Sequence, residues 1–155
     1  MTPQPSVEER KQVEAVIFAF FEAGRNKDLA SLGTLHSSET FSKFDENPPF
    51  TRQNSDEAFV YEQAMFANIS DYSYQIENLR VDFVGGIALA TFYLTYQGMF
   101  VNDYSFEGSP VSSKDRVTMV LKESESEWRI VHEHFSRFPD WQPGKKSEGG
   151  KLHVP

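Results

Sequence analysis

Cysteine is absent from this 155-residue chain, which excludes both a disulfide framework and any chemistry that needs a thiolate. Long hydrophobic runs are absent as well, because the longest one, Ala15 to Phe21, is far too short to span a bilayer. The N-terminal stretch "MTPQPSVEERKQ" lacks the basic and apolar segments of a secretory signal. We therefore expect a cytoplasmic protein that does not enter a membrane.

Positive charge is scarce, since 15 Lys and Arg residues stand against 23 Asp and Glu, a formal net charge of −8. This excess of negative charge makes nucleic acids and anionic membrane surfaces poor partners. Phenylalanine, in contrast, is abundant, with 14 residues available to build the interior. The length suits one domain, which we place at residues 1–138. The remainder, residues 139–155, is rich in Pro, Gly and Lys and is expected to be a flexible tail.

The first half of the chain carries the signals of three helices. A capping box, "SVEE", opens the first helix, and apolar residues then recur at helical spacing as far as Gly24. Asp28 can cap a short second helix, and Ser55 or Asp56 can open a third. Between the second and third helices, Glu39 to Asp45 alternates like a short strand.

The second half of the chain has the pattern of long strands joined by tight turns. Gly85-Gly86 is a strong two-residue turn signal, and "ESESE" separates the last two strands. The strands are expected at residues 74–84, 87–100, 116–122 and 128–136. Helices followed by a strand meander predict an α+β fold.

The strand 87–100 is apolar on both faces, so both faces are expected to be buried. Helices can cover only one of them. Phe92, Leu94 and Tyr96 lie on the face that we expect to remain free of helices. A homodimer through this face is the simplest way to cover it.

The closing strand "WRIVHEHFS" and the order of the elements resemble the SnoaL-like proteins of the nuclear-transport-factor-two-like superfamily. That superfamily includes ketosteroid isomerases and the association (hub) domains of calcium/calmodulin-dependent kinases. The resemblance implies a cone-shaped, cystatin-like fold, with three N-terminal helices packed on a strongly curved antiparallel sheet around a pocket. Because this fold hosts enzymes, binders and scaffolds alike, the likeness is weak evidence for any one function.

The ketosteroid isomerase pattern can be compared with the chain residue by residue. The resemblance places the tyrosine of that pattern on Phe20, which cannot donate a hydrogen bond. The carboxylate base falls on Asp45 only if one residue is inserted, and the protonated aspartic acid falls near Asp115 and Arg116. These differences argue against a steroid isomerase.

The hub-domain pattern is a closer match. It implies that Arg116 in "DRV" points into the pocket, with Tyr93 in the place of a second pocket arginine. On the last strand it implies that alternate residues point inward, namely Arg129, Val131, Glu133 and Phe135. The residues between them, Trp128, Ile130, His132 and His134, then face the other side.

His132 and His134 share one strand face and could bind a metal with a third ligand. No cysteine, obvious third histidine or acidic cluster completes such a set, so sheet packing or interface hydrogen bonding is the preferred interpretation. Glu133 is different, because a buried carboxylate needs a partner. Arg116 is the expected partner, either in an ion pair that only shapes the cavity or in a catalytic or ligand-binding pair.

We therefore predict a small-molecule pocket protein, and possible chemistries are isomerase, cyclase or hydratase reactions on a small, partly apolar organic acid, without metal or other cofactor. The candidate catalytic residues are Glu133 and Asp45. The candidate ligand-binding residues are Arg116, Tyr93, Phe135, Phe20, His36 and Tyr61. Ordinary roles stay open for several of them: a surface or capping position for His36, a turn for Asp45, and core filling for the tyrosines. The alternative is a hub-like assembly module with a non-catalytic pocket.

Overall fold

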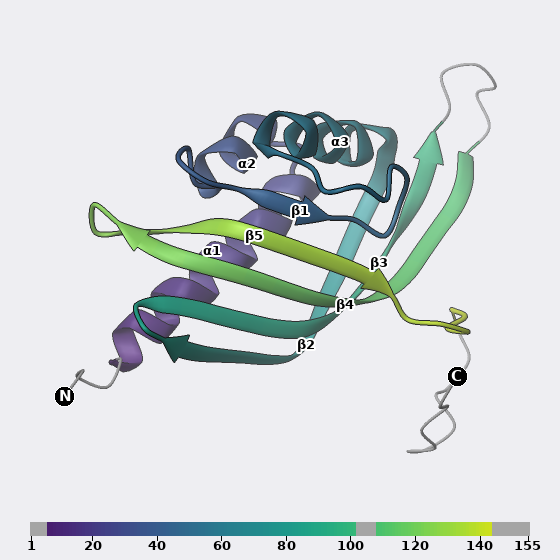
Figure 1. Cartoon of the computed structure of the whole chain (residues 1–155). Coiled ribbons are helices and arrows are strands. Elements are labelled where there is room, and N and C mark those ends of the chain that lie inside the picture. The colour runs from purple at the N-terminus through teal and green to yellow at the C-terminus, as the bar shows by residue number, and fades with distance from the viewer. Residues whose placement is uncertain (1–5, 102–107, 144–155) are drawn as a thin grey trace.

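The computed structural model describes residues 6–101 and 108–143 and has the predicted α+β architecture (Figure 1). Its helices are α1 (Val7–Arg25), α2 (Leu29–Leu35) and α3 (Ser55–Asn68). Its strands are β1 (Ser42–Phe44), β2 (Ile69–Val84), β3 (Ile87–Val101), β4 (Gly108–Ser124) and β5 (Glu127–Arg137). None of the helices in these two ranges is long and apolar enough to cross a membrane. The predicted tail is described only as far as residue 143, and its remainder lies outside the described residues.

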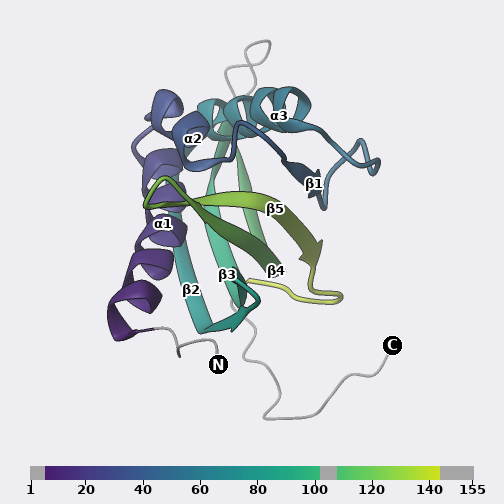
Figure 2. The same ribbon diagram turned by 60° about the vertical axis from the view of Figure 1, so that its left-hand side comes forward.

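The helix starts follow from local capping. Ser6 Oγ accepts the backbone N–H of Glu9 at 3.1 Å, and Asp28 caps α2 as predicted. The third helix begins at Ser55 as predicted, but its cap is the preceding residue, Asn54, which forms a reciprocal capping box with Glu57. Figure 2 shows that α2 and α3 lie together at one end of the molecule, whereas α1 runs along the sheet.

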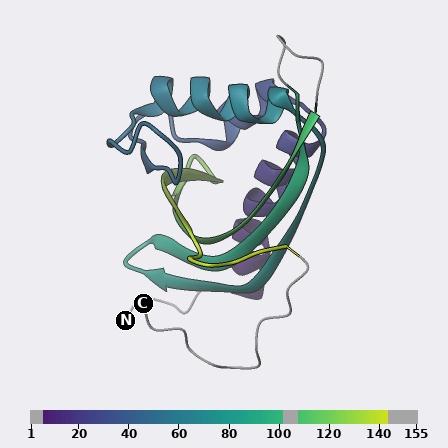
Figure 3. The same ribbon diagram turned by 90° about the vertical axis from the view of Figure 1, so that its right-hand side faces the viewer.

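The five strands form one sheet in the order β1-β5-β4-β3-β2. The predicted antiparallel sheet is in fact mixed, because β1 runs parallel to β5. The long strands bend strongly, so that the sheet curls around the interior (Figure 3). Strand β4 begins at Gly108, well before the predicted residue 116, so part of the expected connection is strand; its residues 102–107 lie outside the described ranges.

Helix α1 packs on the inner face of the sheet, where Phe21 contacts the ring of Phe92 in an edge-to-face arrangement. Phe92, Leu94 and Tyr96 are all buried on this inner face. The premise of the predicted dimer interface, that no helix covers these residues, is therefore wrong. Whether the chain forms a dimer stays a prediction. At the crossing of α1 and α3, a side chain at Gly24 would clash with the Phe66 ring, so only glycine lets these helices approach.

Strand β5 contains a bulge at Val131, where its pairing with β4 slips by one residue. The bulge puts residues of opposite parity on the same side of the sheet. Trp128 and Ile130, before it, are buried in the core, and so are Glu133 and Phe135, after it. The inward direction predicted for Glu133 and Phe135 is therefore correct, whereas the outward direction predicted for Trp128 and Ile130 is wrong.

Candidate active site

Four ionisable side chains meet in the interior, each from a different segment of the chain. His36 ends α2, Lys43 lies on β1, Glu62 on α3 and Glu133 on β5. At most 9% of any of these side chains is exposed. Lys43 Nζ lies 2.9 Å from Glu62 Oε1 and 3.5 Å from Glu133 Oε2. His36 Nε2 donates to Glu133 Oε1 and lies 3.7 Å from Glu62 Oε2.

The fold brings these groups together by three simple means. The parallel pairing of β1 with β5 sets Lys43 directly beside Glu133. Helical spacing puts Glu62 on the same inward stripe of α3 as the buried Ala58 and Phe66. The Leu32 carbonyl accepts the Nδ1 hydrogen of His36 at 2.7 Å and thereby fixes the direction of the ring. Both ring nitrogens of His36 therefore donate hydrogen bonds, as an imidazolium does.

The charges within the cluster shift the pKa values of its members in different directions. Burial lowers the pKa of His36, but the charges of Glu133 and Glu62 outweigh it and raise this pKa to about 9. Burial alone would raise the pKa of Glu133, but Lys43 and His36 lower it to about 2. Burial and the charge of Glu133 raise the pKa of Glu62 to about 7, against the opposing effects of Lys43 and His36. Near neutral pH, Glu62 is therefore the group of the cluster that most readily exchanges a proton.

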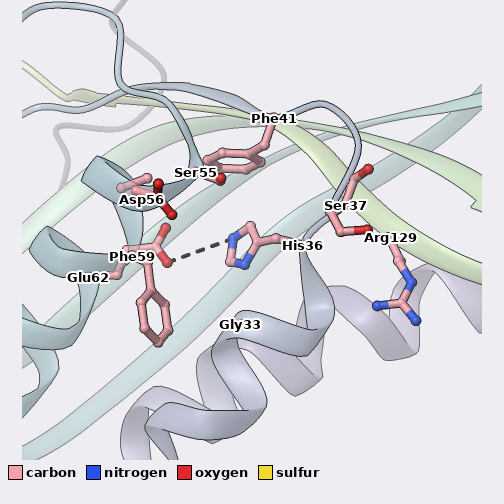
Figure 4. Close-up of a pocket in the computed structure, with 11 residues that line it drawn as sticks. Gly33, His36, Ser37, Phe41, Ser55, Asp56, Phe59, Glu62 and Arg129 are labelled. Atoms are coloured by element: carbon pink, nitrogen blue, oxygen red, sulfur yellow. Dashed lines mark ion pairs between the residues drawn. The ribbon is translucent and has the colours of Figure 1, made fainter.

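A cavity of about 250 Å³ opens onto this cluster between α2, α3 and the chain that leads into β1. His36 and Glu62 form its polar inner wall, and Phe41 and Phe59 lie on opposite sides of this pair in Figure 4. Further residues that line the cavity are Gly33, Ser37, Ser38, Ser55, Asp56 and Arg129. The cavity thus combines apolar walls with an acid/base pair, as small-molecule sites commonly do.

A second, inner cavity of about 20 Å³ lies on the other side of Glu62 and has room for about one water molecule. A second carboxyl pair, Glu46 and Asp115, lines it. The Ser113 hydroxyl lies 2.7 Å from Asp115 Oδ1 and 3.4 Å from Glu46 Oε2, and Tyr96 donates to Glu46 at 2.9 Å. Burial and the neighbouring Glu46 raise the pKa of Asp115 to about 9, so this pair holds a proton at neutral pH.

His36, Glu62 and Glu133 also resemble a metal-ligand set, because their donor atoms lie within 4.8 Å of one another. The charge of Lys43, however, already balances these carboxylates, since its ammonium group contacts both of them. The ammonium is further held over the ring of Phe135, 4.7 Å from the ring centroid. The donor set therefore fits a lysine-centred ion cluster better than a metal centre.

The predicted Arg116–Glu133 pair is wrong. Arg116 is exposed, and the partners of Glu133 are His36 and Lys43. The reason is the alternation of β4, which directs Asp115 and Val117 inward and Arg116 outward. The pattern of apolar residues in "DRVTMVL" carries this signal, whereas the resemblance to hub domains favoured the wrong residue.

Two of the other predicted ligand-binding residues also lie elsewhere. Tyr93 is 37% exposed and packs against Phe138 on the outer face of the sheet, and Tyr61 is 42% exposed on α3. Neither residue lines either cavity. Their positions therefore contradict a role as ligand donors in these cavities.

Four of the five remaining predicted site residues lie at the two cavities. His36 lines the larger cavity, and Phe20, Phe135 and Asp45 line the inner one. Asp45 Oδ1 accepts the backbone N–H of Glu46, and burial raises the pKa of Asp45. Glu133 lines neither cavity and is the fully buried carboxylate behind His36 and Lys43. Their roles in binding or catalysis stay predictions.

Sequence reasoning missed two members of the cluster, Lys43 and Glu62. A signal for Glu62 exists, because it lies four residues from both Ala58 and Phe66 on the helix. Nothing comparable marks Lys43, since an inward lysine on a three-residue strand cannot be told from an exposed one by pattern.

His132 and His134 lie on the outer face of the sheet, where both rings pack against Phe44. The ring of His132 also bonds to Ser42 Oγ at 2.8 Å. This arrangement agrees with sheet packing, the preferred interpretation of the histidine pair.

A family model described as the SnoaL-like domain matches residues 13–140. The chain belongs to the SnoaL-like domain family. The predicted resemblance is therefore confirmed, and the family covers both cavities and the four-residue cluster.

Solved structures show the same fold at low sequence identity. A candidate dehydratase of the NTF2-like family from Streptomyces avermitilis has a TM-score of 0.70 and 19% identity, covering 83% of this chain and 95% of that one. An uncharacterised protein with a cystatin-like fold from Caulobacter vibrioides has a TM-score of 0.68 and 20% identity over 86% and 92%. A ketosteroid isomerase-like protein from Erwinia carotovora atroseptica has a TM-score of 0.66 and 17% identity over 86% and 98%. No curated protein matches the chain.

Proposed function

We propose that this SnoaL-like protein catalyses proton transfer on a small carbonyl compound in its 250 Å³ cavity, with Glu62 as the acid/base group. One observation carries the proposal: a buried carboxyl group with a pKa of about 7 lies 3.7 Å from a buried imidazolium, and both face the same cavity. A carboxyl group with a pKa near the working pH both accepts and returns a proton efficiently. Strongly shifted pKa values in a cavity are typical of functional groups.

The proposed step is an enolisation followed by reprotonation. The Glu62 carboxylate takes a proton from the carbon next to the carbonyl, and the C–H electron pair becomes a new C=C bond. The carbonyl electron pair moves to the oxygen. The positive charge of the His36 imidazolium, whose two N–H groups already donate to Glu133 and the Leu32 carbonyl, stabilises the negative charge there through space. Return of the proton from Glu62 to the same carbon restores the carboxylate and the carbonyl group. In a substrate with a C=C bond one carbon further along, the enolate is a dienolate. Return of the proton to its far carbon then re-forms the carbonyl group, moves the C=C bond into conjugation and yields an isomer.

Glu133 and Lys43 act on Glu62 and His36 rather than on the substrate in this proposal. Glu133 keeps His36 protonated, and Lys43 limits the rise of the Glu62 pKa. The names of two structural neighbours, a ketosteroid isomerase-like protein and a candidate dehydratase, fit this chemistry as fold-level analogies. The alternative of a hub-like assembly module stays a prediction, which the mass of the particle in solution tests.

Hydrogen–deuterium exchange in D₂O tests the proposal directly. We expect the protein to accelerate exchange at the carbon next to the carbonyl in at least one member of a panel of small ketones, followed by NMR. Glu62→Gln should lower that rate roughly 10²–10⁴-fold, because the amide cannot accept the proton. Glu123→Gln, which removes an exposed carboxylate from β4, is the matched control and should leave the rate unchanged. Equal rates for the parent protein and Glu62→Gln would refute the proposal.

A further inference from the structure

The larger cavity has a shape that restricts what can enter it. Its two aromatic side chains, Phe41 and Phe59, are partly buried against the core and lie on opposite sides of the His36–Glu62 pair in Figure 4. The Phe41 ring is also held edge-to-face against the His36 ring, at 4.7 Å and 84°. Walls of this kind favour a flat ligand, because aromatic rings pack well by offset stacking or edge contact.

The volume of the cavity indicates the size of ligand that fills it. An apolar cavity of about 150 Å³ is enough for benzene, whereas drug-sized ligands need about 300–1,000 Å³. A cavity of about 250 Å³ therefore suits one ring with a few substituent atoms. Fused systems of several rings are therefore expected to bind less well.

Gly33 leaves the space for the ring. It lies inside the seven-residue helix α2, where glycine is less favourable than alanine for helix formation. A Cβ atom at this position would meet the Phe59 ring at 3.4 Å, an ordinary contact. Larger side chains would extend into the cavity beside Phe59. Gly33, which is unfavourable for helix formation, thus stands at a position that lines the cavity.

We infer that the cavity selects a single flat ring bearing one carbonyl or hydroxyl group at its edge, and that Gly33 is the residue that determines this size limit. The inference rests on the proposed function, because it places the polar edge of the ring at His36 and Glu62. The faces of the ring contact Phe41 and Phe59. Serine hydroxyl groups and Arg129 also line the cavity and meet the substituents of the ring.

Binding of phenol and 9-phenanthrol, measured by NMR titration of the His36 ring hydrogens, tests the inference. We expect phenol to bind with saturation and 9-phenanthrol not to bind. Gly33→Ala should keep phenol binding, whereas Gly33→Val should weaken it roughly tenfold or more, because the added methyl groups occupy the ring site. Ala30→Val is the matched control, since it adds the same side chain on the exposed side of α2 and should bind phenol like the parent protein.

Two outcomes would overturn the size limit: phenol binding to Gly33→Val as tight as to the parent, or 9-phenanthrol binding as tight as phenol. The proposed function fails in a different experiment, the Glu62-dependent exchange. If phenol does not bind but an acyclic ketone exchanges in a Glu62-dependent way, only the inference about the ring is wrong. If the ring probes bind as expected and no ketone exchanges, only the proton-transfer chemistry is wrong.

Discussion

The two buried carboxyl pairs of this protein are neutralised in different ways. Glu62 and Glu133 share two buried cations, Lys43 and His36. Glu46 and Asp115 have no buried cation among the described residues, because Arg137, 3.6 Å from Glu46, is 58% exposed. One pair is therefore balanced by fixed positive charge and the other by a bound proton.

The difference gives the carboxyl groups of the two pairs different pKa values. In the first pair, the opposing effects of burial and cations leave the pKa of Glu62 at about 7. In the second pair, burial and Glu46 raise the pKa of Asp115 without a comparable opposing charge. The pKa values of Glu62 and Asp115 thus differ because of the charges beside them. Lys43, which contacts the first pair and has no buried counterpart beside the second among the described residues, is the main source of this difference.

Lys43→Met gives the largest expected effect, because it removes the central cation of the first pair. We expect a loss of about 3–5 kcal/mol in the free energy of unfolding, since two buried carboxyl groups would then share only His36. Urea denaturation at pH 7 measures the loss. Lys122→Met, which removes an exposed lysine from β4, should change stability by less than about 0.5 kcal/mol.

A double variant sharpens this first prediction. Adding Glu133→Gln to Lys43→Met removes one of the two buried charges, so part of the lost stability should return. Simple addition of the two single losses would contradict the direct coupling of Lys43 to Glu133.

Asp115→Asn tests the second pair through its pH dependence. The pKa of Asp115 is about 9 in the folded protein and near 3.8 without the fold. Its contribution to stability is therefore complete below pH 3.8 and is lost as the pH rises through 9. Glu133 behaves oppositely, because its lowered pKa makes its contribution disappear only as the pH falls toward 2.

Asparagine cannot ionise, so the variant should lack the decline in stability that Asp115 causes between pH 4 and 9. We expect Asp115→Asn to exceed the parent at pH 9 by roughly 1–3 kcal/mol, the typical cost of a buried unsatisfied group. Urea midpoints measured from pH 4 to pH 9 follow this difference, with Glu123→Gln as the control. Parallel curves for the parent and Asp115→Asn would show that Asp115 is ionised throughout.

Arg116→Ala gives the smallest expected effect, because Arg116 contacts neither pair. We expect a change within about 0.5 kcal/mol, as for most exposed residues. The same urea experiment measures it. A loss comparable to that of Lys43→Met would mean that Arg116 is buried and would reverse the inside–outside assignment of β4.

The fold was within reach of sequence reasoning because its signals are local. Capping at Asp28, the turn at Gly85-Gly86 and the alternation of the last strands each act over a few residues. The full lengths of β2 and β4 could not be predicted in this way. The residues by which these strands exceed the prediction are held in the sheet by pairing with β3, not by a local signal.

The site was less predictable for the same reason. Glu133 and His36 were both found, yet their contact was not, because it depends on the bulge at Val131 and on β1 pairing in parallel with β5. Sequence alternation gives the face of a residue but does not give its partner on another element. The burial of Lys43 and the cavity beside Gly33 depend on contacts between distant segments, so the sequence pattern does not predict them.

The parallel pairing of β1 with β5 also determines when, during synthesis and folding, the cluster of His36, Lys43, Glu62 and Glu133 can form. His36 and Glu133 are 97 residues apart, and β5 is the last strand of the sheet. Contacts of such separation form late and slowly, and synthesis delivers the N-terminal segments first. While the ribosome still holds β5, the helices and the first hairpin can already be complete, yet Lys43 and Glu62 have no Glu133 to meet. The four-residue cluster is therefore complete only after the final strand has been synthesised and has paired with β1.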